Sequence, residues 1–131
     1  PLGNVISGGE HTHGKSPDMQ EFLVLPHGAE SLLEAAMANS QIHRRIGALL
    51  KKGDKLFSGG KSDEGAWIAN IETLDALEIL AKACEEVGNE LGFECRFGID
   101  VAAVRELGRK FADQLREDFR AMGTELEKIG K

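Results

Sequence analysis

Polar side chains gather in a glycine-rich loop between two short apolar runs near the start of the chain, and their types could bind a ligand. The loop contains His11 and His13 and ends at Glu21, directly before the apolar run 22–25. A carboxylate at the entrance of a buried strand either points into a site or costs stability. The glycines of the loop allow its backbone to turn tightly or to approach a ligand closely.

Simpler interpretations of these side chains stay open. Glu21 and Glu64 can be ordinary solvated carboxylates on the surface of the domain. His11 and His13, with His27 further along, could bind a transition metal such as zinc, but no cysteine lies near them and no fourth ligand has suitable spacing.

Three strands are expected to hold the polar residues in place. Val5 and Ile6 form a short apolar pair, and residues 22–25 form a continuous apolar run, which is typical of a strand buried on both faces. A third strand is expected over residues 95–103, where apolar and polar positions alternate and Asp100 lies on the polar side. In a barrel, that side faces the interior or the rim.

Two helices are expected between the second and third strands. The first begins at a capping box formed by Ser31 and Glu34 and ends at Gly53. Leu33 and Met37 are among the apolar side chains expected on its buried face.

The second helix is expected to be capped by Asn70 or Thr73 and to end at Gly88. The polar connection over residues 53–69 is long for a compact domain, and connections of this length are usually functional.

The composition is that of a folded, acidic chain. Of its 131 residues, 41% are hydrophobic, which is enough for the core of one modest domain. A net charge of −6 argues against nucleic acid or an anionic membrane surface as a partner, because these require a basic face. No apolar run approaches the ~20 residues of a membrane span, and no signal peptide is visible. Cys84 and Cys95 are expected to be free thiols in a reducing, cytoplasmic compartment, with a disulfide as the alternative.

Four short segments of the sequence resemble enolase, the phosphopyruvate hydratase of glycolysis, in its archaeal form. They occur in the family's order and at about its spacing: Asn4-Val5-Ile6-Ser7-Gly8-Gly9-Glu10-His11, Gln20-Glu21-Phe22, Asp63-Glu64-Gly65-Ala66-Trp67 and Gly98-Ile99-Asp100-Val101-Ala102-Ala103. The resemblance implies an α/β fold, namely the opening part of a TIM-type (β/α) barrel in the order strand-strand-helix-helix-strand. Ala66 departs from the family pattern, which usually has a second glycine there.

The resemblance also implies a reaction and the residues that take part in it. The family dehydrates 2-phosphoglycerate to phosphoenolpyruvate with Mg²⁺ as its cofactor. Glu64 matches the catalytic glutamate that donates a proton to the departing hydroxide. Glu21 matches the second catalytic glutamate, a substrate contact with Gln20 beside it, and His11 matches a substrate-binding histidine on a mobile loop. Asp100 matches one of three carboxylates that bind magnesium, an ion that prefers oxygen ligands.

Two regions are expected. Residues 1–103 resemble the partial barrel, and residues 104–131 do not. From Val104 to Ile129 apolar residues recur every three or four positions, which predicts one long amphipathic C-terminal helix.

The expected chemistry is incomplete within this sequence. In the family the lysine base, the other two magnesium carboxylates and further substrate-binding residues belong to later barrel strands. A closed barrel takes about 250 residues, so we expect the chain by itself not to turn over substrate. The alternative function is a non-catalytic interaction or oligomerisation module that binds a second copy of the chain or a complementing half of the barrel.

Overall fold

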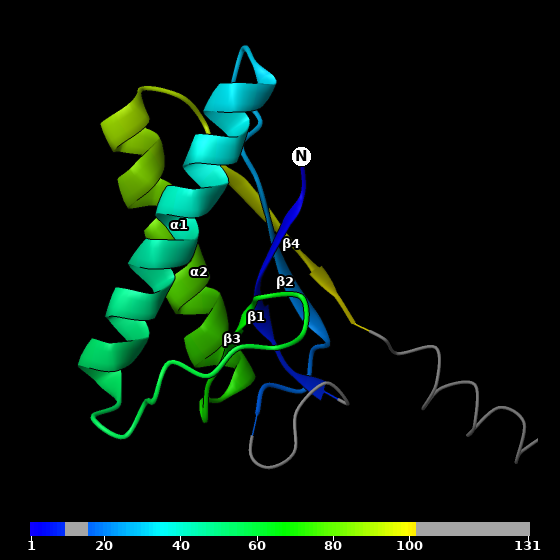
Figure 1. The fold of residues 1–131 in the computed structure, drawn as a ribbon, viewed down its shortest axis with the longest axis vertical. Coiled ribbons are helices and arrows are strands. Elements are labelled where there is room, and N and C mark those ends of the chain that lie inside the picture. The colour runs from blue at the N-terminus through cyan, green and yellow to red at the C-terminus, as the bar shows by residue number, and fades with distance from the viewer. Residues whose placement is uncertain (10–15, 102–131) are drawn as a thin grey trace, which may run out of the picture. The chain divides into compact units, whose positions relative to one another are not determined.

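The computed structural model describes residues 1–9 and 16–101. The elements in chain order are β1 (Gly3–Ser7), β2 (Glu21–Leu25), α1 (Leu32–Gly53), β3 (Trp67–Ile68), α2 (Thr73–Leu91) and β4 (Arg96–Asp100) (Figure 1). The predicted order strand, strand, helix, helix, strand is confirmed, and β3 is an additional strand of two residues. His11 and the predicted C-terminal helix lie outside the described residues.

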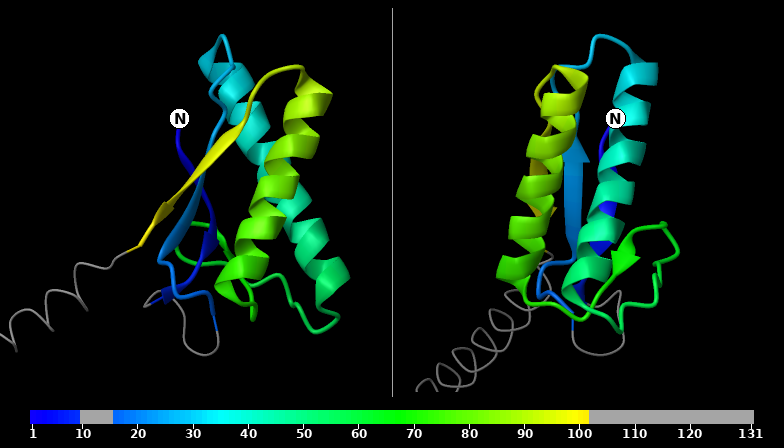
Figure 2. Two further views of the ribbon diagram at one scale, coloured as in Figure 1. Left: turned by 180° about the vertical axis from the view of Figure 1, so that it is seen from behind. Right: turned by 90° about the vertical axis from the view of Figure 1, so that its left-hand side faces the viewer.

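The four strands form one open sheet in the order β3-β1-β2-β4. β1 pairs antiparallel with β2, β2 pairs antiparallel with β4, and β3 runs parallel to β1. Both helices lie on the same face of this sheet (Figure 2). The predicted α/β class is therefore correct. Within the described ranges, no helix combines the length and the apolar character needed to cross a bilayer.

The start of α1 follows directly from the sequence. Ser31 Oγ accepts a hydrogen bond from the Glu34 backbone N–H at 3.2 Å, and Glu34 Oε2 accepts one from the Ser31 N–H at 3.2 Å. This reciprocal pair is the predicted capping box, which satisfies two backbone donors that the first turn leaves unpaired. Lys51 and Lys52 lie in the last turn, where their positive charge interacts favourably with the negative end of the helix dipole.

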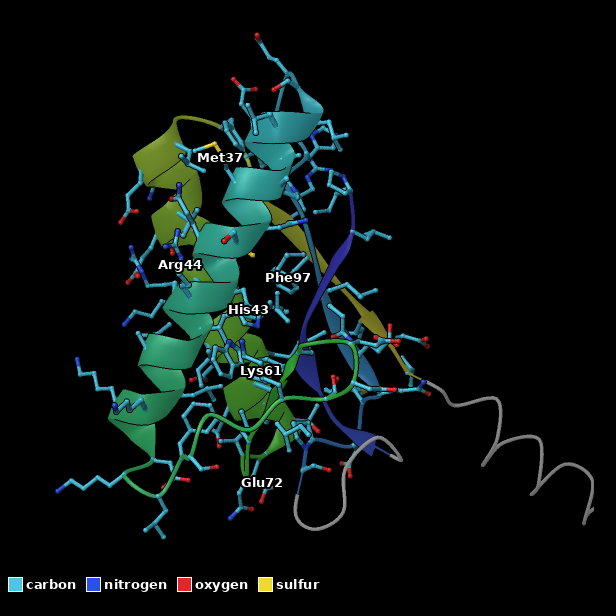
Figure 3. The ribbon with its side chains drawn as sticks, viewed as in Figure 1. Met37, His43, Arg44, Lys61, Glu72 and Phe97 are labelled. Atoms are coloured by element: carbon cyan, nitrogen blue, oxygen red, sulfur yellow. The ribbon has the colours of Figure 1, made fainter. Side chains whose placement is uncertain are left out.

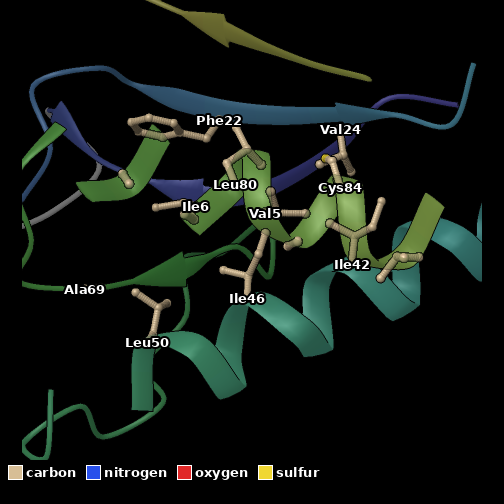
Figure 4. Packing of buried hydrophobic residues seen from close by; sticks show 13 residues of the cluster. Val5, Ile6, Phe22, Val24, Ile42, Ile46, Leu50, Ala69, Leu80 and Cys84 are labelled. Carbon is tan, nitrogen blue, oxygen red and sulfur yellow. The ribbon is translucent and has the colours of Figure 1, made fainter. Parts of the chain in front are cut away.

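The hydrophobic core lies between the sheet and the two helices (Figure 4). Phe22 and Val24 of β2 are fully buried there, whereas Leu23 is half-buried and Leu25 is 36% exposed. The expectation that β2 is buried on both faces was therefore wrong. The helices cover one face, and the described residues leave the other face of β2 more accessible.

The buried side of α1 differs from the predicted one in the first half of the helix. Ala35, Ala38 and Ile42 are buried, while Leu33 is 71% and Met37 51% exposed. The first turns of α1 meet the core through alanine, so the larger apolar side chains beside them remain in solvent. The sequence prediction assigned the largest apolar side chains to the buried face. Which side chains are buried depends instead on how the helix is oriented where it crosses the sheet.

The second helix begins and ends at residues other than those predicted. Its N-cap is Glu72, and it continues to Leu91 before Gly92 ends it in the left-handed conformation with φ of 79°. Gly88 lies inside the helix, and a Cβ at this position would come within 2.9 Å of the Phe93 carbonyl oxygen. This glycine therefore marks a close approach of backbone rather than a helix end.

The two cysteines are free thiols, as predicted. Cys84 is buried on α2, and burial raises the pKa of its thiol to about 12. At neutral pH this thiol stays protonated and behaves as a small apolar side chain of the core.

Candidate functional site

The strand register places three polar residues side by side across the sheet. Glu21 at the start of β2 lies opposite Ser7 of β1 on one side and Asp100 of β4 on the other. Directly opposed residues of neighbouring strands point to the same face of a sheet. Phe22, next to Glu21, is buried against the helices, so this row belongs to the face away from α1 and α2.

Glu64 is linked to this row through β1. Asn4 Nδ2 donates a hydrogen bond to Glu64 Oε2 at 2.9 Å, and the same nitrogen lies 3.4 Å from Ser7 Oγ. Ser7 Oγ in turn donates to Ser62 Oγ at 3.2 Å. The loop that contains Ser62 and Glu64 is thus fastened to β1, on the strand whose Ser7 lies opposite Glu21.

The other side of the same loop is fastened to α1 by a pair of aromatic rings that we call the His43–Trp67 clamp. His43 Nε2 donates to the Gly65 carbonyl oxygen at 2.9 Å, and Trp67 Nε1 donates to the His43 carbonyl oxygen at 2.7 Å. The two rings stack with centroids 4.6 Å apart, and Lys61 Nζ lies 4.4 Å from the Trp67 ring centroid. Figure 3 shows His43 and Lys61 close together beside α1. Gly65 follows Glu64 directly, so the clamp fixes the backbone next to the predicted acid.

Burial sets the protonation of the clamp histidine. It lowers the pKa of His43 below 6.5, and the hydrogen bond to the Gly65 carbonyl oxygen opposes this effect. The positive charge of Lys61 lowers the pKa further. A carbonyl oxygen only accepts, so Nε2 carries the hydrogen of the ring.

Gln20 contributes to the site region through its backbone. Its N–H donates to the Asp100 carbonyl oxygen, and its own carbonyl oxygen accepts from the Gly8 N–H, both at 3.0 Å. These bonds join β1, β2 and β4 at the end of the sheet where Glu21 lies. His11 lies outside the described residues, so its proximity to this end stays a prediction.

The described residues fit a magnesium ion by donor type but do not form a complete site. Asp100 and Glu21 are neighbours across two strands, and carboxylate oxygens are the ligands that Mg²⁺ prefers. Among residues 1–9 and 16–101, no group of three or more His, Cys, Asp or Glu side chains could hold a metal ion. The zinc alternative rested on His11 and His13 together with His27, and it stays open because His11 and His13 are not described.

Sequence reasoning assigned no role to the residues that hold Glu64. Asn4 and Ser7 were visible as polar side chains beside an apolar pair, and such residues usually require a polar partner. His43 is followed by two arginines in the sequence, and this basic run gives no sign of an aromatic partner. Its partner Trp67 is 24 residues away, and no local pattern reveals such a contact.

An open sheet with helices on one face and acidic residues at one end of its strands is compatible with one part of a (β/α) barrel domain. A family model described as "Enolase, C-terminal TIM barrel domain" matches residues 1–126. The chain therefore belongs to the enolase family, and the resemblance found in its motifs is confirmed.

Relatives in archaea support this membership. Over 103 residues the chain is 54% identical to the enolase of Methanothermobacter thermautotrophicus, 50% to that of Methanosphaera stadtmanae and 48% to that of Pyrobaculum aerophilum. Each match covers 79% of this chain and 25% of the relative. The chain spans about a quarter of the length of these relatives. The boundary expected at residue 103 stays a prediction.

Proposed function

We propose that this chain is the part of an enolase catalytic barrel that supplies Glu64, Glu21 and Asp100 to the Mg²⁺-dependent dehydration of 2-phosphoglycerate to phosphoenolpyruvate. The observation that carries the proposal is the grouping of these residues: Glu21 lies opposite Asp100 in the sheet, and Asn4 ties Glu64 to the neighbouring strand. The setting that follows is glycolysis in the cytoplasm.

The carboxylates have different tasks in this proposal. Glu64, on an exposed loop, acts as the general acid that protonates the departing hydroxide. Glu21 and Gln20 contact the substrate, together with His11. Asp100 contributes one oxygen ligand to magnesium, and the remaining ligands come from elsewhere in the complete barrel. When bound, magnesium supplies positive charge that stabilises the substrate carboxylate.

The test is a chimaera. The matched segment of this chain replaces the corresponding 103 residues of the Methanothermobacter thermautotrophicus enolase, to which it is 54% identical. We expect phosphoenolpyruvate to form when 2-phosphoglycerate and magnesium are added. A chimaera that folds cooperatively and binds substrate, yet forms no product, would contradict the proposal.

A second candidate function rests on a separate observation. β4 is an edge strand, and Phe97, Ile99 and Val101 at this edge are 45%, 41% and 43% exposed. Exposed apolar side chains on a strand with one open edge favour association with a further strand. The alternative is therefore an interaction module that binds a second copy or a complementing half-barrel. Sedimentation of the 131-residue chain tests this, because a module of this kind forms a stable oligomer.

A further inference from the structure

The side chain that forms a hydrogen bond with Glu64 comes from the start of the described chain. Asn4 lies 60 positions before Glu64 in the sequence, yet its Nδ2 is 2.9 Å from Glu64 Oε2. Asn4 belongs to β1 and lies opposite Leu23 of β2, so its backbone is held inside the sheet. Glu64 lies on an exposed loop, which passes beside β1 in Figure 1. The fixed partner of this pair is therefore the amide, and the partner that needs orienting is the carboxyl group.

Oxygen atoms surround one side of the Asn4 amide. Its Nδ2 lies within 3.4 Å of Ser7 Oγ as well as near Glu64 Oε2, whereas its Oδ1 is buried without a hydrogen-bond partner among the described residues. Exchanging the nitrogen and oxygen would place Oδ1 against the ionised Glu64 carboxylate, and both of these groups are acceptors. Asn4 therefore donates toward Glu64 when this carboxylate is ionised.

We propose that Asn4 is a positioning residue that determines which oxygen of Glu64 carries the transferable proton. This inference rests on the proposed function. Oε2 accepts the Asn4 hydrogen bond, so it serves as the carbonyl oxygen when Glu64 is protonated, and the proton lies on Oε1. A carboxyl group that rotated freely would offer its proton in several directions, most of them away from substrate.

The proton balance of the step is complete. A base in the rest of the barrel removes the carbon-bound proton, and the electron pair of that bond forms the new carbon–carbon double bond. The carbon–oxygen bond breaks with its electrons on the departing oxygen. The Oε1–H bond of Glu64 breaks, its proton joins that oxygen, and water leaves. Throughout this step Asn4 keeps its bond to Oε2 and exchanges no proton.

The contact itself can be tested on the 131-residue chain by NMR, independently of catalysis. The side-chain ¹⁵N–¹H signals of Asn4 are recorded in the unmodified chain, in Glu64→Ala and in the matched control Asp63→Ala, which removes the adjacent exposed carboxylate. We expect the Asn4 signals to move in Glu64→Ala and to stay in place in Asp63→Ala. Unchanged Asn4 signals in Glu64→Ala would overturn the proposal.

The catalytic consequence is tested in the chimaeric enolase. Asn4→Asp keeps the shape but replaces the donor with an acceptor, and Asn4→Ala removes the group altogether. We expect kcat to fall about 10- to 100-fold in both, with KM for 2-phosphoglycerate within about twofold, because a hydrogen bond to a charged group has this magnitude. The control is Asn39→Ala, an amide that donates instead to the Pro1 carbonyl oxygen.

The two proposals fail in different ways. An active chimaera in which Asn4→Asp keeps its full kcat would overturn the role of Asn4 and leave the proposed function intact. A folded but inactive chimaera with the natural Asn4 would remove the proposed function, and the role of Asn4 with it. A loss of kcat that Asn39→Ala shares would show a general structural effect and also count against Asn4.

Discussion

Glu64 is exposed on its loop, and its carboxylate contacts Asn4 rather than a core side chain. We therefore expect Glu64→Gln to abolish turnover in the chimaeric enolase while the free energy of unfolding changes by about 0.5 kcal/mol or less, as for most surface substitutions. Glutamine keeps an oxygen that accepts from Asn4, but it has no acidic proton to donate. Product formation and urea unfolding of the same preparation check both parts. Near-normal turnover would remove Glu64 from the role of acid.

Gly47 on α1 lies against the Trp67 ring of the clamp, where there is no room for a side chain. A Cβ at this position would lie 2.6 Å from Trp67 Cζ2 and 2.9 Å from Cε2, so alanine would push the ring off His43. Overpacking of this kind costs about 1–3 kcal/mol, and alanine regains about 1 kcal/mol of helix propensity. We expect Gly47→Ala to destabilise the chain by roughly 1 kcal/mol net. Gly53→Ala is the control in urea unfolding, because no atom lies within 4 Å of the added Cβ.

Single residues differ in how far the sequence reveals them. The positions of Glu21 and Asp100 followed from motifs and strand alternation, and the sheet register then brings them opposite each other. The contact of Asn4 with Glu64 could not be predicted, because it joins segments 60 residues apart. Local patterns describe which way a strand residue points. Such patterns do not identify which distant loop will contact that residue in the folded chain.

At the scale of elements, α1 and the loop before β3 depend on each other through the clamp. Since burial lowers the folded-state pKa of His43, the unfolded chain binds more protons between that pKa and about 6.5. Stability should therefore rise with pH through this window. It should be fully present above about pH 6.5 and lost as the pH falls through the lowered pKa.

The measurement is a series of urea unfolding curves between about pH 5 and pH 7.5, a range that spans the ordinary histidine pKa. His43→Gln removes the titrating ring and should flatten the slope of unfolding free energy against pH relative to the unmodified chain. His27→Gln is the control, because His27 is exposed and its ring contacts Glu94, with Nδ1 3.7 Å from Oε2, rather than a residue of the clamp. Equal slopes in the His43 variant and the unmodified chain would contradict the prediction.

Elements were predictable where local chemistry determines them. The Ser31 capping box set the start of α1, and both predicted hydrogen bonds are present. Gly88 misled the prediction of where α2 ends, because glycine also occurs where another backbone comes close, here that of Phe93. β3 was missed since two residues give no periodicity, and the strand exists through its pairing with β1.

At the scale of the whole molecule, the proposed function makes this chain one part of a larger metal site. Asp100 and Glu21 are the carboxylates that the sheet brings together, and the described residues contain no group of three metal-binding side chains. We therefore expect the 131-residue chain to bind Mg²⁺ with a Kd of about 1 mM or weaker, because affinity follows ligand number and geometry. Calorimetry measures this. A tight stoichiometric site would show that the chain, or an oligomer of it, assembles a complete set of ligands.

The open edge of the sheet leads to the last prediction. Phe97, Ile99 and Val101 at the β4 edge are between 41% and 45% exposed, and such an edge favours association. No further strand pairs with this edge among the described residues, and family membership explains this, since a barrel closes only when later strands are added. The sequence from residue 104 to residue 129 predicts a helix with an apolar stripe, which could cover surface of this kind.

Deleting residues 104–131 should therefore make the remaining chain aggregate or lose cooperative unfolding. Sedimentation and thermal unfolding of the truncated chain and of the 131-residue chain measure both effects. The matched control keeps the length and replaces two residues of the predicted stripe, Leu115→Asp and Phe119→Asp. If apolar contact is what protects the chain, this control should behave like the deletion, because a charged side chain cannot cover apolar surface without loss of hydration. A truncated chain that stays monomeric and unfolds at the same temperature would show that residues 104–131 contribute nothing to the stability of the rest.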